Sequence, residues 1–256
     1  MGGFVASKET RVSDESFDGK VVLVTGSSMG IGEETARAFA ARGARVVINS
    51  ARSVEEGRAV AASIQGHYIQ ANIADPDAPR VLIDGTLAHY GRLDVLVNNA
   101  GTTKVIPHQD VDAATVDVWR EIFDVNVFAT WAVSVAALPA LRETNGSIVN
   151  VSSVAGLRQT GSSIPYAASK AALNHLTALL AKVVGPNVRV NAVAPGLVDT
   201  PWTDDWDVVR GFVQQGAPLK RSGVPTDIAE VIVSLASSAY VTGQILAIDG
   251  GLSLVV

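Results

Sequence analysis

Seven short runs of nearly continuous apolar residues, rich in valine and isoleucine, alternate along this chain with longer alanine-rich stretches. A run that is apolar at every position is typical of a strand covered on both faces, as in a parallel sheet. The expected strands are Val21–Thr25, Arg45–Asn49, Tyr68–Ala71, Leu93–Asn98, Ser147–Val151, Val188–Val193 and Ile245–Asp249. The expected helices lie near 30–42, 54–64, 76–90, 112–138, 165–184 and 225–238. This alternation predicts βαβ units, and therefore an α/β fold in which helices cover both faces of a parallel sheet.

The pattern runs on without a repeat, a low-complexity segment or a linker rich in proline and glycine. The chain has 256 residues, of which 48% are hydrophobic, so one large α/β domain with a sizeable core accounts for its length. We expect this domain to span residues 19–256, behind a polar tail of residues 1–18. The least regular stretch is Asp199–Arg221, which holds Trp202 and Trp206 and is expected to act as a lid or a binding loop.

Charge and residue usage exclude several classes of function. A net charge of −5 leaves no basic footprint for nucleic acid and no polybasic segment for a membrane surface. The absence of cysteine excludes disulfides and thiolate catalysis, and the four histidines show no spacing of metal ligands. The N-terminus lacks the apolar core of a secretory signal, and the uncharged run Val125–Leu141 is expected to be a helix buried against other protein. We therefore expect a cytoplasmic protein that acts on a small molecule, with no metal, nucleic-acid or membrane partner.

A glycine-rich turn follows the first expected strand and leads directly into a helix. Its sequence is Thr25-Gly26-Ser27-Ser28-Met29-Gly30-Ile31-Gly32. Glycines let the backbone approach a pyrophosphate closely, and the helix N-terminus offers free N–H groups and a positive dipole end. The predicted cofactor contacts in the turn are Gly26, Ser28, Met29, Gly30, Ile31 and Gly32. The alternative is a tight turn that binds no ligand. The turn lacks the Lys-Ser/Thr pair of a P-loop, which argues against a nucleoside triphosphatase.

The end of the second strand bears on the choice between the two nicotinamide dinucleotides. An NAD site usually places a carboxylate there to bond the ribose 2′-hydroxyl, whereas this chain reads Asn49-Ser50-Ala51-Arg52-Ser53. Ser50 and Arg52 could instead bond a 2′-phosphate through charge-assisted hydrogen bonds. The sequence therefore favours NADP(H) over NAD(H). The alternative is that Arg52 is a solvated residue on a surface turn.

Further markers follow the glycine turn in a fixed order. They are Asn98-Asn99-Ala100-Gly101, Asn126, Ser153, Tyr166 with Lys170, and Pro195-Gly196-Leu197-Val198-Asp199-Thr200. With this ordered set the chain resembles the short-chain dehydrogenase/reductase family over roughly Lys20–Leu252. The closing segment Gly216–Leu252 is similar to the 3-oxoacyl-carrier-protein reductases and related ketone reductases. The resemblance implies a doubly wound Rossmann-type sheet of seven strands and hydride transfer between NADP(H), or NAD(H), and a ketone or secondary alcohol.

Tyr166 and Lys170 lie four residues apart just after Pro165, which suits the first turns of a helix and places both side chains on one face. The pKa of an unperturbed tyrosine is about 10, and a nearby ammonium lowers it. Tyr166 could then exchange a proton with the substrate oxygen as acid or base. The resemblance implies that Tyr166 and Lys170 are also cofactor contacts, with Lys170 bonding the nicotinamide ribose. An ordinary helix pair, with the tyrosine packed and the lysine solvated, is the alternative.

Two polar residues are expected to assist this pair. Ser153 follows the fifth strand and could orient the substrate oxygen, although its hydroxyl could equally bond the local backbone. Ser152 is the competing candidate, and the family spacing favours Ser153. The resemblance implies that Asn126 holds a water that links Lys170 to solvent. A core asparagine bonded to the backbone is compatible with that role.

The resemblance assigns the remaining cofactor contacts. They are Asn72 and Ile73 near the adenine, Asn99, Ala100 and Gly101 beneath the cofactor, and Pro195, Gly196, Val198 and Thr200 at the carboxamide. The family often has an aspartate where this chain has Asn72. Asp75 is expected to cap the helix that begins near Pro76.

Two other classes of protein are alternatives, a non-catalytic dinucleotide-binding sensor and an interaction protein with degraded sites. Both are disfavoured because Tyr166 and Lys170 are intact. Helices 112–138 and 165–184 carry little charge, and in this family they pair across a dimer interface, often within a tetramer. Burial inside one subunit would give the same pattern. His108 and Arg158 could border the substrate or lie on the surface.

Overall fold

The computed structural model describes residues 16–255, and these form a parallel seven-stranded sheet in the order β3-β2-β1-β4-β5-β6-β7. The strands are β1 (Val21–Val24), β2 (Arg45–Ser50), β3 (His67–Gln70), β4 (Val95–Asn98), β5 (Ser147–Val151), β6 (Arg189–Pro195) and β7 (Ile245–Ile248). The helices are α1 (Gly30–Ala40), α2 (Val54–Ser63), α3 (Ala78–Tyr90), α4 (Val116–Phe123), α5 (Thr130–Thr144), α6 (Ile164–Val184), α7 (Asp207–Gly216) and α8 (Pro225–Ser237). Short or irregular turns of helix are η1 (Asp124–Ala129), η2 (Val154–Gly156), η3 (Pro201–Thr203) and η4 (Leu252–Leu254). The doubly wound Rossmann-type fold is confirmed.

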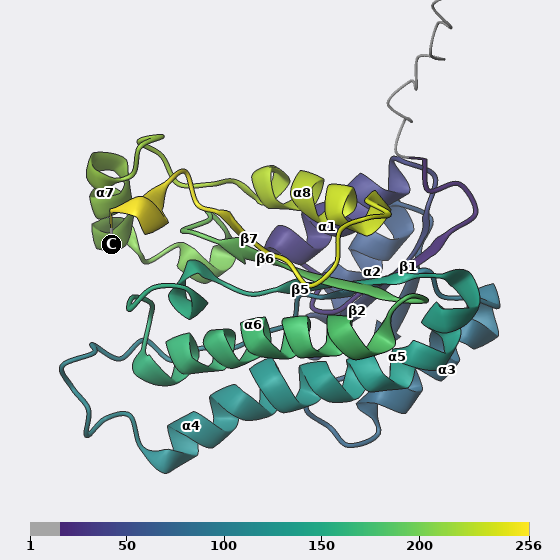
Figure 1. Ribbon diagram of the computed structural model, residues 1–256, viewed down its shortest axis with the longest axis horizontal. Helices are drawn as coiled ribbons and strands as arrows, with labels where there is room; N and C mark the ends of the chain where they lie inside the picture. The colour runs from purple at the N-terminus through teal and green to yellow at the C-terminus, as the bar shows by residue number, and fades with distance from the viewer. Residues whose placement is uncertain (1–15, 256) are drawn as a thin grey trace, which may run out of the picture.

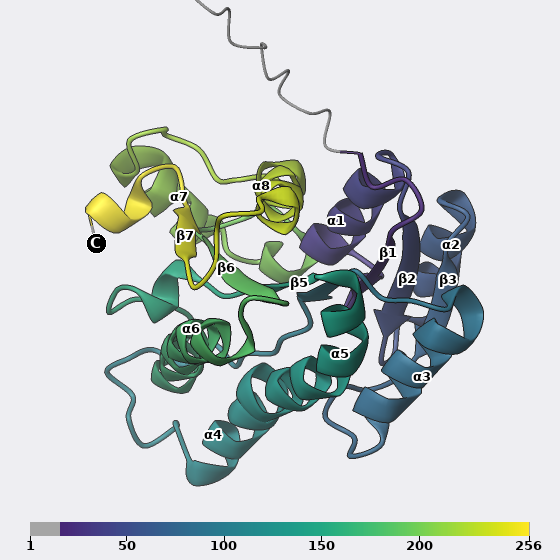
Figure 2. The same cartoon turned by 45° about the vertical axis from the view of Figure 1, so that its right-hand side comes forward.

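Helices cover both faces of the sheet, and each face has its own core (Figure 1, Figure 2). In β1, Val22 and Val24 pack in the core that includes α1 and α8, whereas Val21 and Leu23 pack in the core that includes α3 and α5. Side chains alternate between faces along a strand, so a strand buried on both sides must be apolar at every position. This is the reason that the strands are readable as continuous apolar runs.

The order of the strands places a crevice at the carboxyl end of β1. The chain passes from β1 to β2 and β3 on one side, and then returns to β4 on the other side of β1. Because Val24 pairs in register with Ile48 of β2 and Val97 of β4, the three strands end at the same level. Loops that leave this edge in opposite directions open a ligand crevice, as in other doubly wound sheets.

The helix expected at 112–138 continues to Thr144 and contains Pro139. Proline has no N–H, so one carbonyl of the preceding turn loses its partner. That carbonyl belongs to Val135, whose side chain is 40% exposed, so water can reach this side of the helix. The stretch Val116–Thr144 is long and apolar enough to cross a membrane, but Val133 and Leu141 on its inner face are fully buried in the core.

Two other expectations of local structure are wrong. The stretch 199–221 is not irregular throughout, because α7 forms within it and is held by ion pairs from Arg210. Asp75 does not cap α3, which begins at Ala78; its carboxylate accepts a hydrogen bond from the Asn72 side chain at 3.1 Å instead.

The boundary expected for the N-terminal tail falls too late in the chain. Phe17 was expected to belong to the tail, yet it is 1% exposed and packs edge-on against Phe39 of α1, with ring centroids 4.9 Å apart. The ordered core therefore reaches Phe17, and residues 1–15 of the expected tail lie outside the described part of the chain.

Candidate active site

A cavity of about 680 Å³ opens at the carboxyl ends of β1 to β6. Its lining includes every cofactor and catalytic residue that the sequence predicts except Gly32 and Asn126. Both exceptions lie just behind the wall. A Cβ added to Gly32 would fall 2.4 Å from Asn99 Nδ2, and a Cβ added to Gly101 would fall 3.3 Å from Asn126 Oδ1. The structure thus brings residues from six strand ends, those of β1 to β6, to one site.

The glycine turn has the shape needed to receive a pyrophosphate. Gly26 and Gly30 adopt φ values of +62° and +60°, which favour glycine, and Gly32 has no room for a side chain. Met29 precedes α1 in extended conformation, and within residues 16–255 no side chain caps the start of this helix. Its first N–H groups are therefore available to an anion at the positive end of the dipole. The residues present fit a dinucleotide cofactor.

Side chains from β2 and β4 hold this turn in place. Asn99 Nδ2 donates to the carbonyls of Thr25 and Gly26 at 3.0 and 2.7 Å. Asn49 Oδ1 accepts from the Gly26 N–H at 3.2 Å, while its Nδ2 donates to the carbonyls of Ile69 and Ala71. The sequence analysis missed Asn49, although a polar residue at the end of a buried apolar strand was a usable signal.

At the adenosine end, only Arg52 of the predicted residues has an uncommitted side chain. Ser50 Oγ donates to the Ser53 carbonyl and bonds the Tyr68 hydroxyl, each at 2.8 Å. The Asn72 side chain is used in its own turn, with Asp75 and the Ala74 N–H as partners. Arg52 is exposed, and within the described chain it forms no ion pair. A negatively charged group bound here would meet a free guanidinium.

Tyr166 and Lys170 both face the cavity from the start of α6. Ser163 caps this helix by accepting from the Tyr166 N–H at 3.4 Å, and Pro165 lies in its first turn. Lys170 is only 4% exposed; its Nζ donates to the Val151 carbonyl at 2.9 Å and lies 5.7 Å from the centroid of the Tyr166 ring. The solvated lysine of the alternative interpretation is not seen.

Burial decides the protonation of this pair. It lowers the pKa of Lys170 to about 8 and raises the pKa of Tyr166, while a hydrogen bond with Ser153 works against the rise. The sequence predicted a lowered tyrosine pKa, and this direction is wrong for the protein alone. The Lys170 ammonium is held on the Val151 carbonyl, and burial disfavours the phenolate more than a nearby cation favours it. Tyr166 therefore carries its proton at neutral pH.

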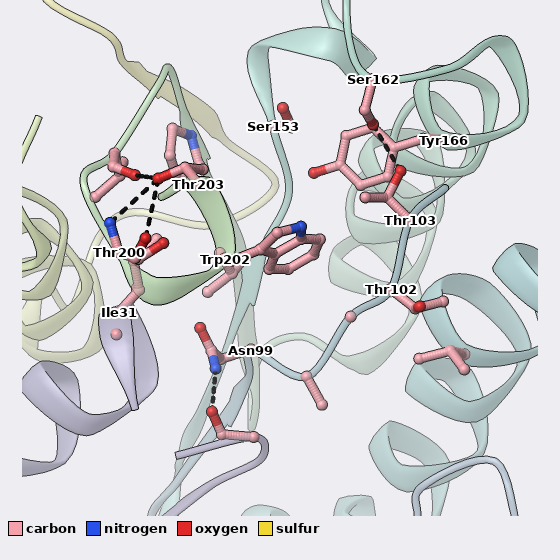
Figure 3. Close-up of a pocket in the computed structure, with 18 of the residues that line it drawn as sticks. Ile31, Asn99, Thr102, Thr103, Ser153, Ser162, Tyr166, Thr200, Trp202 and Thr203 are labelled. Atoms are coloured by element: carbon pink, nitrogen blue, oxygen red, sulfur yellow. Dashed lines mark hydrogen bonds between the residues drawn. The ribbon is translucent and has the colours of Figure 1, made fainter. Parts of the chain in front are cut away.

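The two neighbouring serines after β5 face different ways. Ser152 is buried, and its hydroxyl donates to the Lys170 carbonyl at 3.3 Å on α6. The Ser153 hydroxyl and the Tyr166 hydroxyl both face the cavity, where they lie close to each other (Figure 3). Its Oγ also accepts from the Ala155 N–H at 3.1 Å, so it caps η2 as the backbone alternative anticipated. A hydroxyl oxygen has two lone pairs and a proton, so this bond leaves Ser153 able to donate to a substrate.

Asn126 lies in η1, a π-helical stretch of the kind often found at functional sites. Its Oδ1 accepts from the Thr102 N–H at 2.8 Å, and its Nδ2 donates to the Thr102 carbonyl and the Ser169 hydroxyl at 3.0 Å. The side chain thus anchors the segment after β4. A Cβ added to Gly101 would lie 3.6 Å from Lys170 Nζ as well, so glycine keeps the space between Asn126 and Lys170 open.

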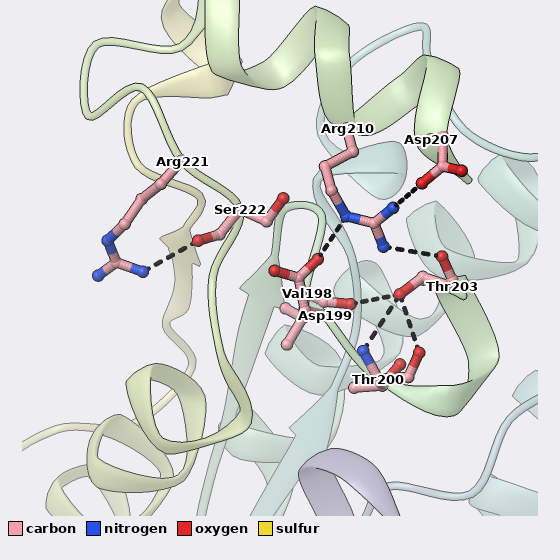
Figure 4. Close-up of polar contacts among 8 residues, drawn as sticks. All are labelled: Val198, Asp199, Thr200, Thr203, Asp207, Arg210, Arg221 and Ser222. Atoms are coloured by element: carbon pink, nitrogen blue, oxygen red, sulfur yellow. Dashed lines mark hydrogen bonds and ion pairs between the residues drawn. The ribbon is translucent and has the colours of Figure 1, made fainter. Parts of the chain in front are cut away.

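An aromatic segment closes the side of the cavity opposite Tyr166. Trp202, Trp206 and Val209 line it from η3 and α7, and the Trp202 indole lies between Ser153 and Asn99 in Figure 3. Arg210 holds this segment on the end of β6 by bonding Asp199 at 3.0 Å, together with Asp207 and the Thr203 carbonyl (Figure 4). The wall is therefore apolar toward the cavity, and the polar contacts of Arg210 hold it in place from behind.

Other polar residues divide between this cavity and the rest of the surface. The main cavity also has a hydroxyl-bearing wall that the sequence analysis did not predict, made by Thr102, Thr103, Thr160 and Ser162. His108 and Arg158 line a separate, smaller hollow, and Arg158 donates to the Ser253 carbonyl at 2.8 Å. Within residues 16–255, no three His, Asp or Glu side chains gather as metal ligands would.

Known proteins are similar to this chain in sequence and in fold. The family described as enoyl-(acyl carrier protein) reductase matches residues 26–253. A protein named as ketoacyl reductase 2 of the granaticin polyketide synthase of Streptomyces violaceoruber is 53% identical, over 91% of this chain and 96% of its own. A 3-oxoacyl-[acyl-carrier-protein] reductase of Thermotoga maritima is 39% identical, over 92% of this chain and 98% of its own.

A solved structure of similar sequence also has the fold of this chain. The structure, described as a short-chain dehydrogenase/reductase from Burkholderia xenovorans, superposes with a TM-score of 0.86 at 38% identity. The match covers 92% of this chain and 98% of that one. The chain therefore belongs to the short-chain dehydrogenase/reductase family, and it is an NAD(P)-dependent oxidoreductase that acts on carbonyl or alcohol groups.

Proposed function

We propose that this protein reduces a ketone with NADPH, or oxidises the corresponding secondary alcohol, with Tyr166 as the acid or base. The observation that carries the proposal is the meeting of Tyr166, Ser153 and Lys170 in one cavity with an uncapped helix N-terminus. A proton donor, an orienting hydroxyl and a site for the pyrophosphate are the parts that hydride transfer to a carbonyl requires. A sensor that only binds the dinucleotide would have no use for a proton donor and an orienting hydroxyl, which Tyr166 and Ser153 place together in this cavity.

The residues divide the work as follows. When bound, the cofactor supplies the hydride to the carbonyl carbon. Ser153 donates a hydrogen bond to the carbonyl oxygen and fixes its orientation, and Tyr166 gives its proton to the same oxygen. The raised pKa of Tyr166 suits this direction because the phenol is protonated at neutral pH. For the reverse reaction, positive charge near the phenol must first lower its pKa.

Lys170 and Asn126 are proposed to return the proton that Tyr166 gives away. A pKa of about 8 lets Lys170 lose and regain a proton near neutral pH. The second lone pair of Asn126 Oδ1 is free to hold a water in the space that Gly101 leaves open. We propose that the same ammonium also bonds the ribose hydroxyls of the cofactor.

We infer a preference for NADP(H) from the charges along the cavity. Its charged lining residues are Arg52, Lys170 and Glu121, and Glu121 pairs with Lys104 at 2.6 Å. Among residues 16–255, no carboxylate lines the adenosine end, where an NAD site would place one. Arg52 is the group that would bond a 2′-phosphate.

Arg52→Met should therefore weaken NADPH binding and leave NADH binding nearly unchanged. A charge-assisted hydrogen bond is worth about 1.5–3 kcal/mol, so the dissociation constant of NADPH should rise about 10- to 100-fold. Fluorescence titration of the nicotinamide measures both constants. Arg58→Met, an exposed arginine on neighbouring α2, is the matched control and should change neither. Tighter binding of NADH than NADPH by the unaltered protein would reverse the inference.

The substrate is proposed to be an uncharged ketone with a sizeable apolar part. Trp202, Trp206, Val209 and Leu252 supply apolar lining, and Lys170 is the one cation near the reacting groups among the described residues. Two relatives are named for ketoacyl and 3-oxoacyl groups, so 3-oxo compounds belong first on a substrate panel. Absorbance of NADPH and NADH, followed in both directions, tests the panel.

We also propose that two or four copies of the chain assemble through the outer faces of η1, α5 and α6. Large apolar side chains are exposed there, with Phe128 at 59%, Trp131 at 43%, Leu179 at 51% and Val183 at 72%. Large apolar side chains exposed on neighbouring helices are typical of an interface between proteins.

Trp131→Asp should convert the assembly to monomers, because an interface related by two-fold symmetry would bury the charge twice. Sedimentation velocity at micromolar concentration gives the mass. Val208→Asp, at an 89% exposed position on α7, controls for the added charge and should leave the assembly intact. A monomeric unaltered protein would refute the assembly.

A further inference from the structure

Two hydroxyls beside Tyr166 bond to each other across the cavity wall. Thr103 Oγ1 and Ser162 Oγ are 2.6 Å apart, although 59 positions separate them in the chain. Thr103 follows the end of β4, and Ser162 lies just before α6. Figure 3 shows the pair next to the Tyr166 ring, and both residues line the main cavity. We call these two residues the hydroxyl pair.

The hydroxyl pair is not needed to hold its two segments together. The Ile106 N–H donates to the Ser162 carbonyl at 2.8 Å, which already ties one segment to the other. Asn126 holds the backbone of Thr102 by two further hydrogen bonds. Because backbone bonds fix both segments, the side-chain bond adds little to their positions.

The pair retains capacity to bond a ligand. Two hydroxyls carry two protons and four lone pairs, and the bond between them uses one proton and one lone pair. The second proton has only a long contact, 3.4 Å from Thr103 Oγ1 to the Lys104 carbonyl. Hydroxyl bonds are normally 2.5–3.0 Å long, so a ligand oxygen could take this proton at little cost. A few such polar groups in a mainly apolar pocket fix the orientation of a ligand.

The position of the pair relative to Tyr166 is set by Gly161. This residue adopts a φ of +125°, and a Cβ added to it would lie 2.8 Å from the Ala155 Cβ and 3.6 Å from Tyr166 Cδ1. Only glycine lets the segment before α6 approach this closely. Ser162 is thereby held in a fixed position relative to Tyr166, the proposed acid.

We propose that the hydroxyl pair is a second anchor for the substrate and binds an oxygen other than the one that reacts. The inference rests on the proposed function, which places the reacting carbonyl at Tyr166 and Ser153. It defines the substrate class as uncharged ketones that carry a second hydroxyl or carbonyl group. Thr103 and Ser162 are then residues that determine specificity, not residues that take part in proton transfer.

Matched ketones that differ by one hydroxyl test the anchor. The probes are 2-heptanone, 4-hydroxy-2-heptanone and 5-hydroxy-2-heptanone, assayed with NADPH. Thr103→Val removes the hydroxyl at nearly constant volume, and its kcat/KM for at least one hydroxyketone should fall about three- to tenfold, mainly through KM, which corresponds to one lost hydrogen bond. Its kcat/KM for 2-heptanone should stay within about twofold by the same reasoning. Thr103→Ser keeps the hydroxyl and should restore the preference.

Binding constants separate the anchor from the chemistry. In the Tyr166→Phe background with NADPH bound, calorimetry of the same ketones should show the same dependence on Thr103. An equal effect of Thr103→Val on all three ketones would indicate packing alone and would overturn the anchor. So would an absence of any binding difference between the hydroxyketones and 2-heptanone. A lack of turnover by the unaltered protein would instead count against the proposed function, and the binding constants would still decide on the anchor.

Discussion

Tyr166→Phe is expected to lower kcat for ketone reduction by about 10²- to 10⁴-fold, the range that a positioned proton donor contributes. Phenylalanine keeps the ring but lacks the hydroxyl that lies close to Ser153 in the cavity. The residues around the glycine turn are untouched, so the dissociation constant of NADPH should stay within about threefold of the unaltered value. Steady-state kinetics and a fluorescence titration of the same sample give the two quantities.

The control for this variant is Tyr240→Phe, which removes the hydroxyl of a fully exposed tyrosine outside the cavity. It should leave kcat unchanged. If Tyr166→Phe retained near-normal activity, the proton would have to come from another group and the assignment of Tyr166 would be wrong. If NADPH binding were lost together with activity, the tyrosine would be acting mainly as a cofactor contact.

Lys170→Met is expected to remove activity and to stabilise the protein without cofactor at pH 7. Burial lowers the pKa of Lys170 from 10.5 to about 8, so folding at pH 7 must bury an ammonium that is better solvated in the unfolded chain. That difference in pKa corresponds to roughly 3 kcal/mol. Methionine fills a similar volume without the charge, and the lost bond from Nζ to the Val151 carbonyl offsets about 1 kcal/mol. A net gain of about 1–2 kcal/mol is expected, or a few degrees in Tm.

The dependence on pH identifies the cause of this gain. A depressed pKa in the folded state means that the unfolded state binds more protons between pH 8 and 10.5, so the stability of the unaltered protein rises across that window. The advantage of Lys170→Met should be greatest below pH 8 and should shrink as the pH approaches 10.5. Lys182→Met, at an exposed lysine on the same helix, should show no such trend. If Lys170→Met were less stable than the unaltered protein at pH 7, the contacts of the buried ammonium would fully offset its desolvation cost.

Loss of activity in Lys170→Met has a separate reason. The proposed relay and the proposed ribose contact both need the amine, so kcat and the affinity for NADPH should fall together. Burying a charge that is needed for function lowers the stability of the folded protein. Removing such a charge is therefore expected to raise stability and to abolish function. If the residue at position 170 were neutral and served only for packing, replacing it would lower the stability of the protein.

The parts of the protein that could be predicted from sequence are those set by short-range chemistry. Strands buried on both faces must be apolar throughout, which makes central strands such as β1 and β4 readable as continuous apolar runs in the sequence. The glycine turn is readable because its conformation excludes side chains at Gly26 and Gly30. The i and i+4 spacing of Tyr166 and Lys170 places both on one helical face whatever surrounds them. Local geometry of this kind does not depend on which other segments pack nearby.

What the tertiary structure decided depends on contacts between distant residues and on burial. The helix continues through Pro139 because water can reach the Val135 carbonyl, and this solvent access is set by how the helix packs in the fold. The hydroxyl pair joins residues 59 positions apart. The pKa of Tyr166 moves opposite to the expectation from its lysine neighbour, because desolvation is a property of the whole surrounding volume. The sequence by itself determined the fold class and the family's markers, whereas only the packed structure decided their protonation and which side chains line the cavity.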